Sequence, residues 1–153
     1  MATSLLADIA IALTAKLNAE TFTKALTVAR IYDPEVKLEE LAGGRVVVFP
    51  AEEESRAVDA RNIDRRNLVL HVAIQAKLET SSDDDTEEID GWLAYVDEVK
   101  EYLNRLRNMD EEPYFVVTGI EHRPAYSVRH LRESRLFFAL IIVKVRVMWN
   151  MSA

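Results

Sequence analysis

The chain has 153 residues, no cysteine and a formal net charge of −7 at pH 7. This length is typical of one domain, which can bury roughly two thirds of its unfolded surface. The lack of cysteine excludes disulfides, thiolate metal sites and a cysteine nucleophile, and it fits a cytosolic protein. The acidic balance argues against general affinity for nucleic acids, so we expect no sequence-specific nucleic-acid binding.

The first helix is expected from Ser4 (or Thr3), its capping residue, to about Asn18, because apolar residues recur there at three- and four-residue spacing. A signal peptide is disfavoured, since no basic residue precedes the apolar run and Asp8 interrupts it. The longest apolar stretch, residues 136–143, is far shorter than the ~20 residues that a membrane helix needs. We therefore expect neither export nor a membrane partner.

Alternating side chains predict three strands in the next part of the chain, over residues 22–32, 45–50 and 68–78. A helix is the alternative for the first of these segments, which ends at Asp33-Pro34. One helical turn is possible over residues 37–42, and Gly43-Gly44 then turns the chain. The almost wholly polar residues 51–66 predict a long charged connection between the second and third strands.

The second helix is the clearest expectation, because an apolar stripe from Ile89 to Leu106 spans roughly five turns. An extended segment over 114–120, a basic loop over 121–135 and a last strand over 136–149 follow. The first half of that strand is apolar at every position, so we expect helices or another subunit to cover both of its sides. The sequence thus predicts a single α+β domain of two helices packed on a mainly antiparallel sheet, in the order α-β-β-β-α-β-β.

Charge is distributed unevenly along the second half of the chain. Residues 81–112 hold twelve acidic and three basic side chains, whereas residues 113–153 hold two acidic and six basic ones. The folded protein could therefore have two faces of opposite sign, which favours head-to-tail contacts between copies, the geometry that closes rings. Alternatively, these charges only solvate a surface helix and the loop that follows it.

Motifs for catalysis or for cofactor binding are missing from the sequence. The three histidines have no metal-ligand spacing, and four glycines leave little room for a phosphate-binding loop. The acidic run at residues 83–88 lacks the ligand pattern of a calcium loop and suits a helix N-terminus instead. We therefore expect a protein that is not an enzyme and that has no catalytic, cofactor-binding or metal site.

Two groups of arginines are candidates for a protein interface, because the guanidinium group pairs with carboxylates in a bidentate manner. The first lies in the expected connection between the second and third strands, and the second precedes the last strand. A solvated loop is the alternative for the first group, and pairing within the same molecule is the alternative for the second. The candidate interface residues are Arg56, Arg61, Arg65, Arg66, Arg129, Arg132 and Arg135.

Several segments together resemble the tail-terminator (tail-completion, minor tail) proteins of long-tailed bacteriophages. They are the strand end Ala29-Arg30-Ile31-Tyr32-Asp33-Pro34, the segment Leu38-Glu39-Glu40-Leu41, the strand Arg45–Pro50, the loop with Ser55-Arg56 and Asp59-Ala60-Arg61, and the closing stretches Pro124-Ala125-Tyr126-Ser127, Leu131-Arg132-Glu133 and Leu136-Phe137-Phe138. The likeness covers nearly the whole chain, although its motifs are patterns of strand ends and loops rather than of catalytic residues.

The resemblance implies a structural protein that forms a ring, expected to be a hexamer, on the head-proximal end of the tail tube. Such a ring stops tube growth and prepares head–tail joining, so the implied partners are other copies, the tail tube protein and the head–tail connector. The implied location is the virion tail, with the host cytoplasm during assembly. Another head–tail connector or adaptor protein, or a small cytosolic binding module, is the alternative.

Overall fold

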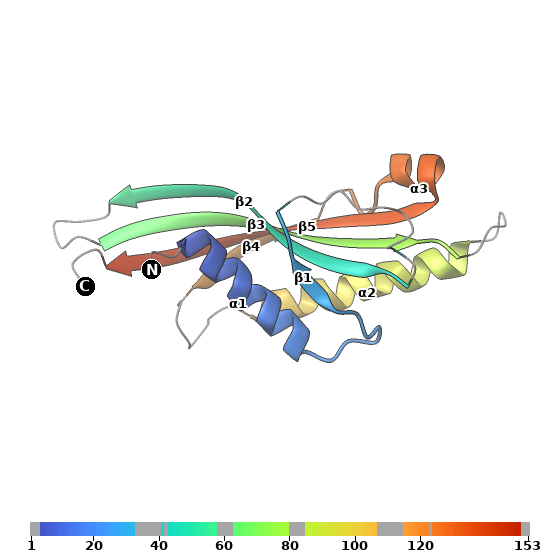
Figure 1. The fold of residues 1–153 in the computed structure, drawn as a ribbon, viewed down its shortest axis with the longest axis horizontal. Helices are drawn as coiled ribbons and strands as arrows, with labels where there is room; N and C mark the ends of the chain where they lie inside the picture. Colours follow the sequence, from blue (N-terminus) through green and yellow to red (C-terminus); the bar gives the residue numbers. More distant parts are fainter. Residues whose placement is uncertain are drawn as a thin grey trace.

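The computed structural model describes residues 4–32, 41, 43–57, 63–79, 85–106, 115–122 and 124–150, with backbone alone at 53–57, 63–65 and 148–150. Three helices and five strands form in these residues (Figure 1). None of these helices has the length and apolar character needed to cross a membrane. In chain order the elements are α1 (Leu5–Ala19), β1 (Val28–Arg30), β2 (Arg45–Ala57), β3 (Ile63–Lys77), α2 (Thr86–Arg105), β4 (Val116–Glu121), α3 (Val128–Ser134) and β5 (Leu136–Asn150).

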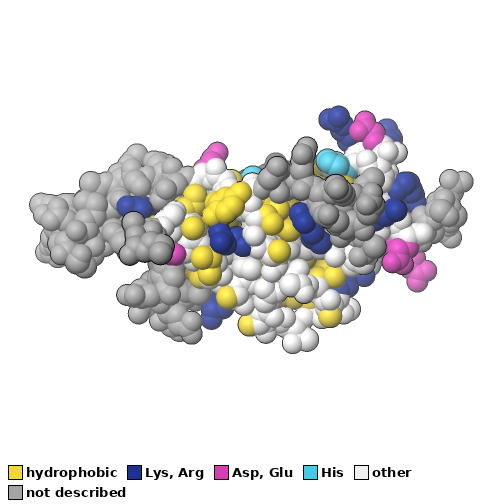
Figure 2. Space-filling view, viewed as in Figure 1, with side chains coloured by type: hydrophobic (Ala, Val, Ile, Leu, Met, Phe, Trp, Pro, Cys, Tyr) yellow, Lys and Arg dark blue, Asp and Glu magenta, His cyan; other side chains and the backbone are white. Residues whose placement is uncertain are grey.

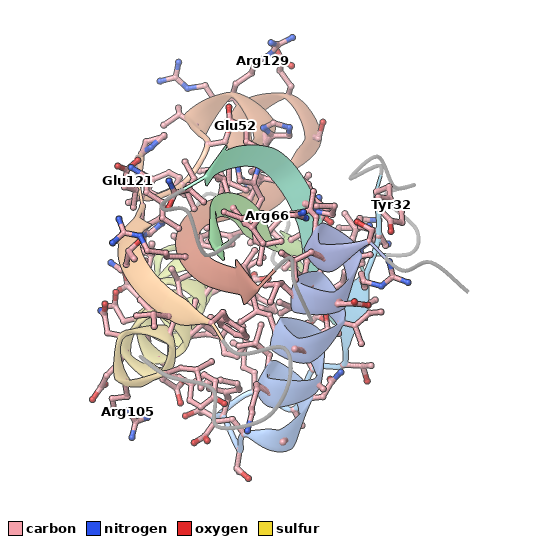
Figure 3. The ribbon with its side chains drawn as sticks, turned by 90° about the vertical axis from the view of Figure 1, so that its left-hand side faces the viewer. Tyr32, Glu52, Arg66, Arg105, Glu121 and Arg129 are labelled. Atoms are coloured by element: carbon pink, nitrogen blue, oxygen red, sulfur yellow. The ribbon has the colours of Figure 1, made fainter. Side chains whose placement is uncertain are left out.

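The strands form one mixed sheet in the order β1-β2-β3-β5-β4. β1 runs parallel to β2, whereas the β2–β3, β3–β5 and β4–β5 pairs are antiparallel. Helices α1 and α2 cover one face of the sheet, and the short α3 lies on the opposite side (Figures 1 and 3). The chain is therefore a single mixed α+β fold, as expected. The predicted order α-β-β-β-α-β-β with two helices is wrong in part, because the described residues form a third helix, α3, between the last two strands.

The pairing of β3 with β5 is the longest in the sheet and is unbroken from Ile63↔Asn150 to Lys77↔Leu136. Because side chains alternate across a strand, this register decides which residues reach the helices. Val143 and Val145 of β5 are buried on the helix side, while Lys144 and Arg146 between them are exposed.

Both long helices begin and pack as their sequences predict. The Ser4 side chain caps α1 by accepting a hydrogen bond from the Ala7 amide over 3.3 Å. Each helix buries one stripe against the sheet, which removes apolar surface from water and stabilises the fold. The buried residues are Leu5, Ile9, Ala10, Leu13 and Leu17 of α1 and Trp92, Tyr95, Val96, Val99 and Leu103 of α2.

The segment between α1 and β1 connects the two helices to each other. The Asn18 amide side chain donates to the Val28 carbonyl over 2.9 Å and accepts from the Val28 amide over 2.8 Å. Phe22 packs edge-on against the rings of Tyr95 and Tyr102, with centroids 5.8 Å away in each case. The strand predicted over 22–32 is therefore wrong in extent, because Phe22 belongs to the helix layer and only Val28–Arg30 pairs with β2.

The predicted charged connection over 51–66 is also wrong, because β2 continues to Ala57 and β3 begins at Ile63. Pro50 does not end β2. The Val48 carbonyl accepts from Ile31 on the β1 side of the strand, and alternation places Pro50 on that same side, past the end of β1. Its missing amide therefore costs no ladder bond, and the register shifts between Pro50 and Glu52.

The prediction of a basic loop over 121–135 is wrong in part, because Val128–Ser134 form a helix, α3. The Ser127 hydroxyl caps this helix by accepting from the His130 amide, and the helix buries none of its residues.

The extended segment expected over 114–120 is β4, and the last strand is confirmed as β5. The helical turn expected over 37–42 lies outside the described residues except for Leu41, which is buried.

Gly43 and Gly44 give a matched pair of variants that tests how Trp92 packs. Both glycines have positive φ angles, of 83° and 89°, but only at Gly44 would a Cβ atom overlap Cη2 of Trp92. Gly43→Ala should therefore lower the free energy of unfolding by about 1 kcal/mol through backbone strain alone. Gly44→Ala should add an overpacking penalty of about 1–3 kcal/mol. Urea unfolding followed by circular dichroism measures both, and equal losses would contradict this packing.

Tyr95 predicts a loss of stability at alkaline pH. Burial, with a smaller effect of the Glu98 carboxylate, raises the pKa of Tyr95 from 10.0 to about 12. Below pH 10 the phenol is neutral in both states, whereas at higher pH it ionises first in the unfolded chain. The free energy of unfolding should then fall by about 1.4 kcal/mol per pH unit as the pH rises toward 12. Tyr95→Phe should reduce this fall, and an unchanged pH dependence in that variant would contradict the assignment.

Candidate assembly surface

The face of the sheet opposite α1 and α2 is partly apolar and only partly covered. We call the half-exposed residues Phe49, Val69, His71, Leu140 and Ile142 the open face; they come from the three central strands β2, β3 and β5. Val47 and Ala73 on the same face are buried. Among the described helices only the short α3 lies on this side of the sheet (Figure 3). Helix α2 packs on one side of β5, and α3 covers only the start of the strand on the other side. Cover of the remaining part by another subunit stays an expectation.

His71 contributes an apolar ring to the open face rather than a charge. Burial lowers the pKa of His71 below its usual 6.5, and the nearby Glu52 carboxylate only partly offsets this effect. The imidazole is therefore neutral at pH 7. Its ring packs edge-on against Phe49 with the centroids 5.1 Å apart. The two aromatic rings form one contiguous surface in the middle of the sheet.

Arg129 and Arg132 stand at one end of the open face, on α3. The His130 ring of this helix stacks on Phe138 of β5, with centroids 4.9 Å apart, which places α3 over the start of that strand. Arg129 is 81% exposed and pairs with Glu133 one helical turn on, at 3.3 Å. Arg132 is exposed as well. Figure 2 shows basic side chains and a histidine gathered at the α3 end of the molecule.

Arg135, the third arginine of this group, has an intramolecular role. Its Nη1 lies 2.7 Å from Oδ2 of Asp85, the residue that precedes α2, and its carbonyl accepts a hydrogen bond from the Leu78 amide. Its backbone is left-handed, with φ of 51°, where it ends α3. The alternative of pairing within the molecule therefore holds for Arg135, which ties α3 to the start of α2.

A second basic group lies farther along β5, on the same side of the sheet. Lys144 and Arg146 are exposed there, because alternation points them away from the helices. The Lys144 ammonium pairs with Glu121 of β4 at 2.7 Å, and Arg146 donates to the Asn67 side chain over 3.4 Å. The open face is thus bounded along β5 by α3 at one end and by these two cations at the other.

The first predicted group of arginines lies on an extension of the sheet. The distal ends of β2, β3 and β5 run past the helices, at the left of Figure 1. Arg56 of β2 and Arg65 of β3 are register partners there, and Ser55 is paired with Arg66. The Arg66 side chain is half-buried and interacts within the molecule, whereas Arg61 lies outside the described residues. The structure therefore brings Arg56, Arg65 and Arg66 to one end of the sheet.

The outward face of α2 is acidic, in contrast to the basic groups on α3, on β5 and at the end of the sheet. Its exposed residues repeat along one side of the helix at three- and four-residue spacing, with an alanine in the middle. Within this set, Asp97 lies 3.8 Å from the Lys100 ammonium. We call this set the acidic stripe: Glu87, Asp90, Ala94, Asp97 and Glu101. The sequence signal for it was the excess of acids over residues 81–112, which did not show how many of them would face outward.

Two of the histidines, His122 and His130, bond to neighbouring backbone or hydroxyl groups. His122 Nε2 lies 2.8 Å from the Ala125 carbonyl, and His130 Nδ1 lies 2.7 Å from the Ser127 hydroxyl. Across the ranges that the structure describes, no three His, Asp or Glu side chains are grouped as metal ligands would be. The chemistry visible on the surface is that of charged and apolar patches.

In comparisons with known proteins, no family model matches the chain, and no curated protein matches it either.

Two variants of Arg135 separate the contribution of its ion pair with Asp85 from the cost of its left-handed backbone. Arg135→Ala removes the ion pair with Asp85 and keeps the unfavourable left-handed backbone, whereas Arg135→Gly removes both. Because the ion pair is partly exposed, its loss should cost about 1 kcal/mol or less. The glycine variant should therefore be more stable than the alanine variant by about 1 kcal/mol in thermal or urea unfolding. An alanine variant at least as stable as the glycine variant would contradict the strain at this position.

Proposed function

We propose that this protein is a structural component of a phage virion that caps the head-proximal end of the tail tube as an oligomeric ring. In this role it ends tube growth and prepares the tail for joining to the head. It acts by assembling with copies of itself, the tail tube protein and the head–tail connector, and not as an enzyme. A hexamer in the virion tail, assembled in the host cytoplasm, is the form that the sequence resemblance implies.

The observation that carries this proposal is the two-sided construction of the molecule. Helices cover one face of the sheet and present the acidic stripe (Figure 3). The other face has the apolar open-face residues and Glu52 between two groups, each of two cations and one carboxylate. Two different surfaces on opposite sides cannot satisfy each other within one copy. Contacts between copies then repeat head to tail, which is the geometry that closes rings. The resemblance to tail terminators supplies the identity of the assembly.

The elongated sheet supports a second part of the role. β3 and β5 each have 15 residues, about 50 Å of strand, whereas α2 is about 30 Å long. The strands therefore extend past the helices and bring Arg56 and Arg65 to one end of the molecule. A ring of such subunits could present these ends to the tube or to the neighbouring subunit.

The direct test is the native mass of the purified protein over a range of concentrations, with electron micrographs of the largest species. Closed rings of about six copies that bind the end of purified tail tubes support the proposal. Rings that bind the portal side instead would favour a head–tail adaptor. A protein that is monomeric at every concentration and does not bind tubes would contradict both assembly roles.

The arginines at the end of the sheet predict a specific defect in tail completion. Replacing Arg56 and Arg65, together with Arg61 from the same predicted group, by alanine should lower the yield of completed tails tenfold or more, since each charge-assisted hydrogen bond contributes roughly 1.5–3 kcal/mol. Arg30→Ala, at an exposed position on β1, is the control and should leave the yield unchanged. A normal yield from the triple variant would remove these arginines from the interface. The variants should unfold at the temperature of the wild type.

A further inference from the structure

We infer that the acidic stripe on α2 of one copy docks on the open face of the next copy, between α3 and the Lys144–Arg146 end of β5. This inference rests on the proposed function, in that it names the contact by which the ring closes. It commits to one partner, a second copy of this chain, and to a head-to-tail contact. The reasons are the positions, the charges and the spacing of the two surfaces.

The positions of the two surfaces require two copies. In Figure 3 Arg129 of α3 and Arg105, the last residue of α2, lie on opposite sides of the sheet. The open face carries the even-numbered residues of β5, while α2 packs on the odd-numbered ones, as Phe137 stacked on Trp92 shows. The stripe of a molecule therefore cannot reach its own open face. Each copy has one of each surface, so contacts continue from copy to copy.

The charges of the two surfaces are complementary. The acidic stripe has four carboxylates around the small Ala94, and all five residues are exposed. The facing surface has Arg129 and Arg132 at one end, with Glu133 paired to Arg129, and Lys144 and Arg146 at the other, with Glu121 paired to Lys144. Each end therefore keeps one net positive charge. Between the ends lie the apolar residues of the open face and the exposed Glu52, which is the register partner of Val69. Opposite charges at the ends steer the two copies together and fix their register, and apolar contact in the middle gains free energy from burial.

The spacing of the charges also agrees. From Glu87 to Glu101 the stripe extends over fourteen residues of helix, about 21 Å. From Phe138, which lies under α3, to Val145, between the two cations, β5 spans about 23 Å. In Figure 1 both α2 and β5 run roughly along the long axis of the molecule. One helix can therefore contact both basic groups while Ala94 lies near Leu140 and Ile142.

The test uses two charge-reversed full-length chains that complement each other. In the first, Asp90, Asp97 and Glu101 are replaced by lysine; in the second, Arg129, Arg132 and Arg146 are replaced by glutamate. Each variant alone places like charges at every contact, so its self-association should weaken about 100-fold or more. A 1:1 mixture restores opposite charges at every contact when the variants alternate. Rings from the mixture should therefore contain equal numbers of each variant, as measured by native mass spectrometry.

The controls separate this contact from net charge and from misfolding. A chain with Lys16→Glu and Arg30→Glu has altered charges on α1 and β1, away from both surfaces, and should assemble like the wild type. Recovery of assembly on mixing shows that both reversed chains are folded, and thermal unfolding of each alone checks this directly. Normal assembly of either reversed variant alone, or no assembly of the mixture when both are folded, would overturn the inference.

Failure of this contact can be distinguished from failure of the proposed function. If the reversed variants still form rings and complete tails, the function stands and the contact lies elsewhere. If the mixture assembles as expected but neither it nor the wild type binds tail tubes, the result supports the contact and contradicts the proposed function. Wild-type chains that complete tails while remaining monomeric in solution at every concentration would also overturn this contact.

Discussion

The pairing of β3 with β5 is the constraint that decides which side chains lie on the helix-covered face of the sheet and which lie on the open face. Its fifteen residue pairs are in one register, and the side chains of β5 alternate along it. A slip of one residue would place Lys144 and Arg146 beneath the helices and expose Val143, Val145 and Val147. Burying two cations without partners would cost several kcal/mol, so the register is strongly determined. The composition of each face follows from that single alignment.

Trp92 is the point at which the helix layer is fixed to this sheet. Its indole ring stacks on Phe137 of β5 at a centroid distance of 6.1 Å and meets Tyr95 edge-on. The Lys24 ammonium lies 4.3 Å from the ring, and the Gly44 backbone is close enough to exclude any side chain. One residue of α2 thus touches the sheet, the α1–β1 segment and the turn before β2. With its inner face held in this way, α2 presents its charged residues outward.

The sequence predicted the two long helices and the central strands because their burial is one-sided. The stripe of α2 and the alternation in β3 are direct consequences of a helix or strand with one face in the core. The distal parts of β2 and β3 lie past the helices, so their polar residues show no such alternation, and the sequence predicts a connection there instead of strands. Helix α3 buries none of its residues and has no stripe, and only the Ser127 cap signalled it.

The candidate interface could be predicted only in part from the sequence. Exposed arginines on α3 follow from composition, but the roles of individual residues depend on tertiary contacts. Arg135 resembles Arg129 and Arg132 in sequence, yet it ends the helix in a left-handed conformation and pairs with Asp85. The only sequence signal for the open face was that the first half of the last strand is apolar at every position. Which side would remain half-exposed depended on where both helices packed.

The half-exposed side chains of the open face bear on how strong a contact between copies would be. Fully burying a large apolar side chain gains about 1.5–3 kcal/mol, and these residues are already partly buried. Association costs at least about 4 kcal/mol in lost freedom, so the apolar residues alone would hold two copies weakly. The charged groups at the ends would then supply steering and register more than affinity. In a closed ring, however, each copy makes two such contacts, and its release requires both to break at once. A weak pairwise contact of this kind therefore suits a subunit that stays dispersed until a full set of copies can close.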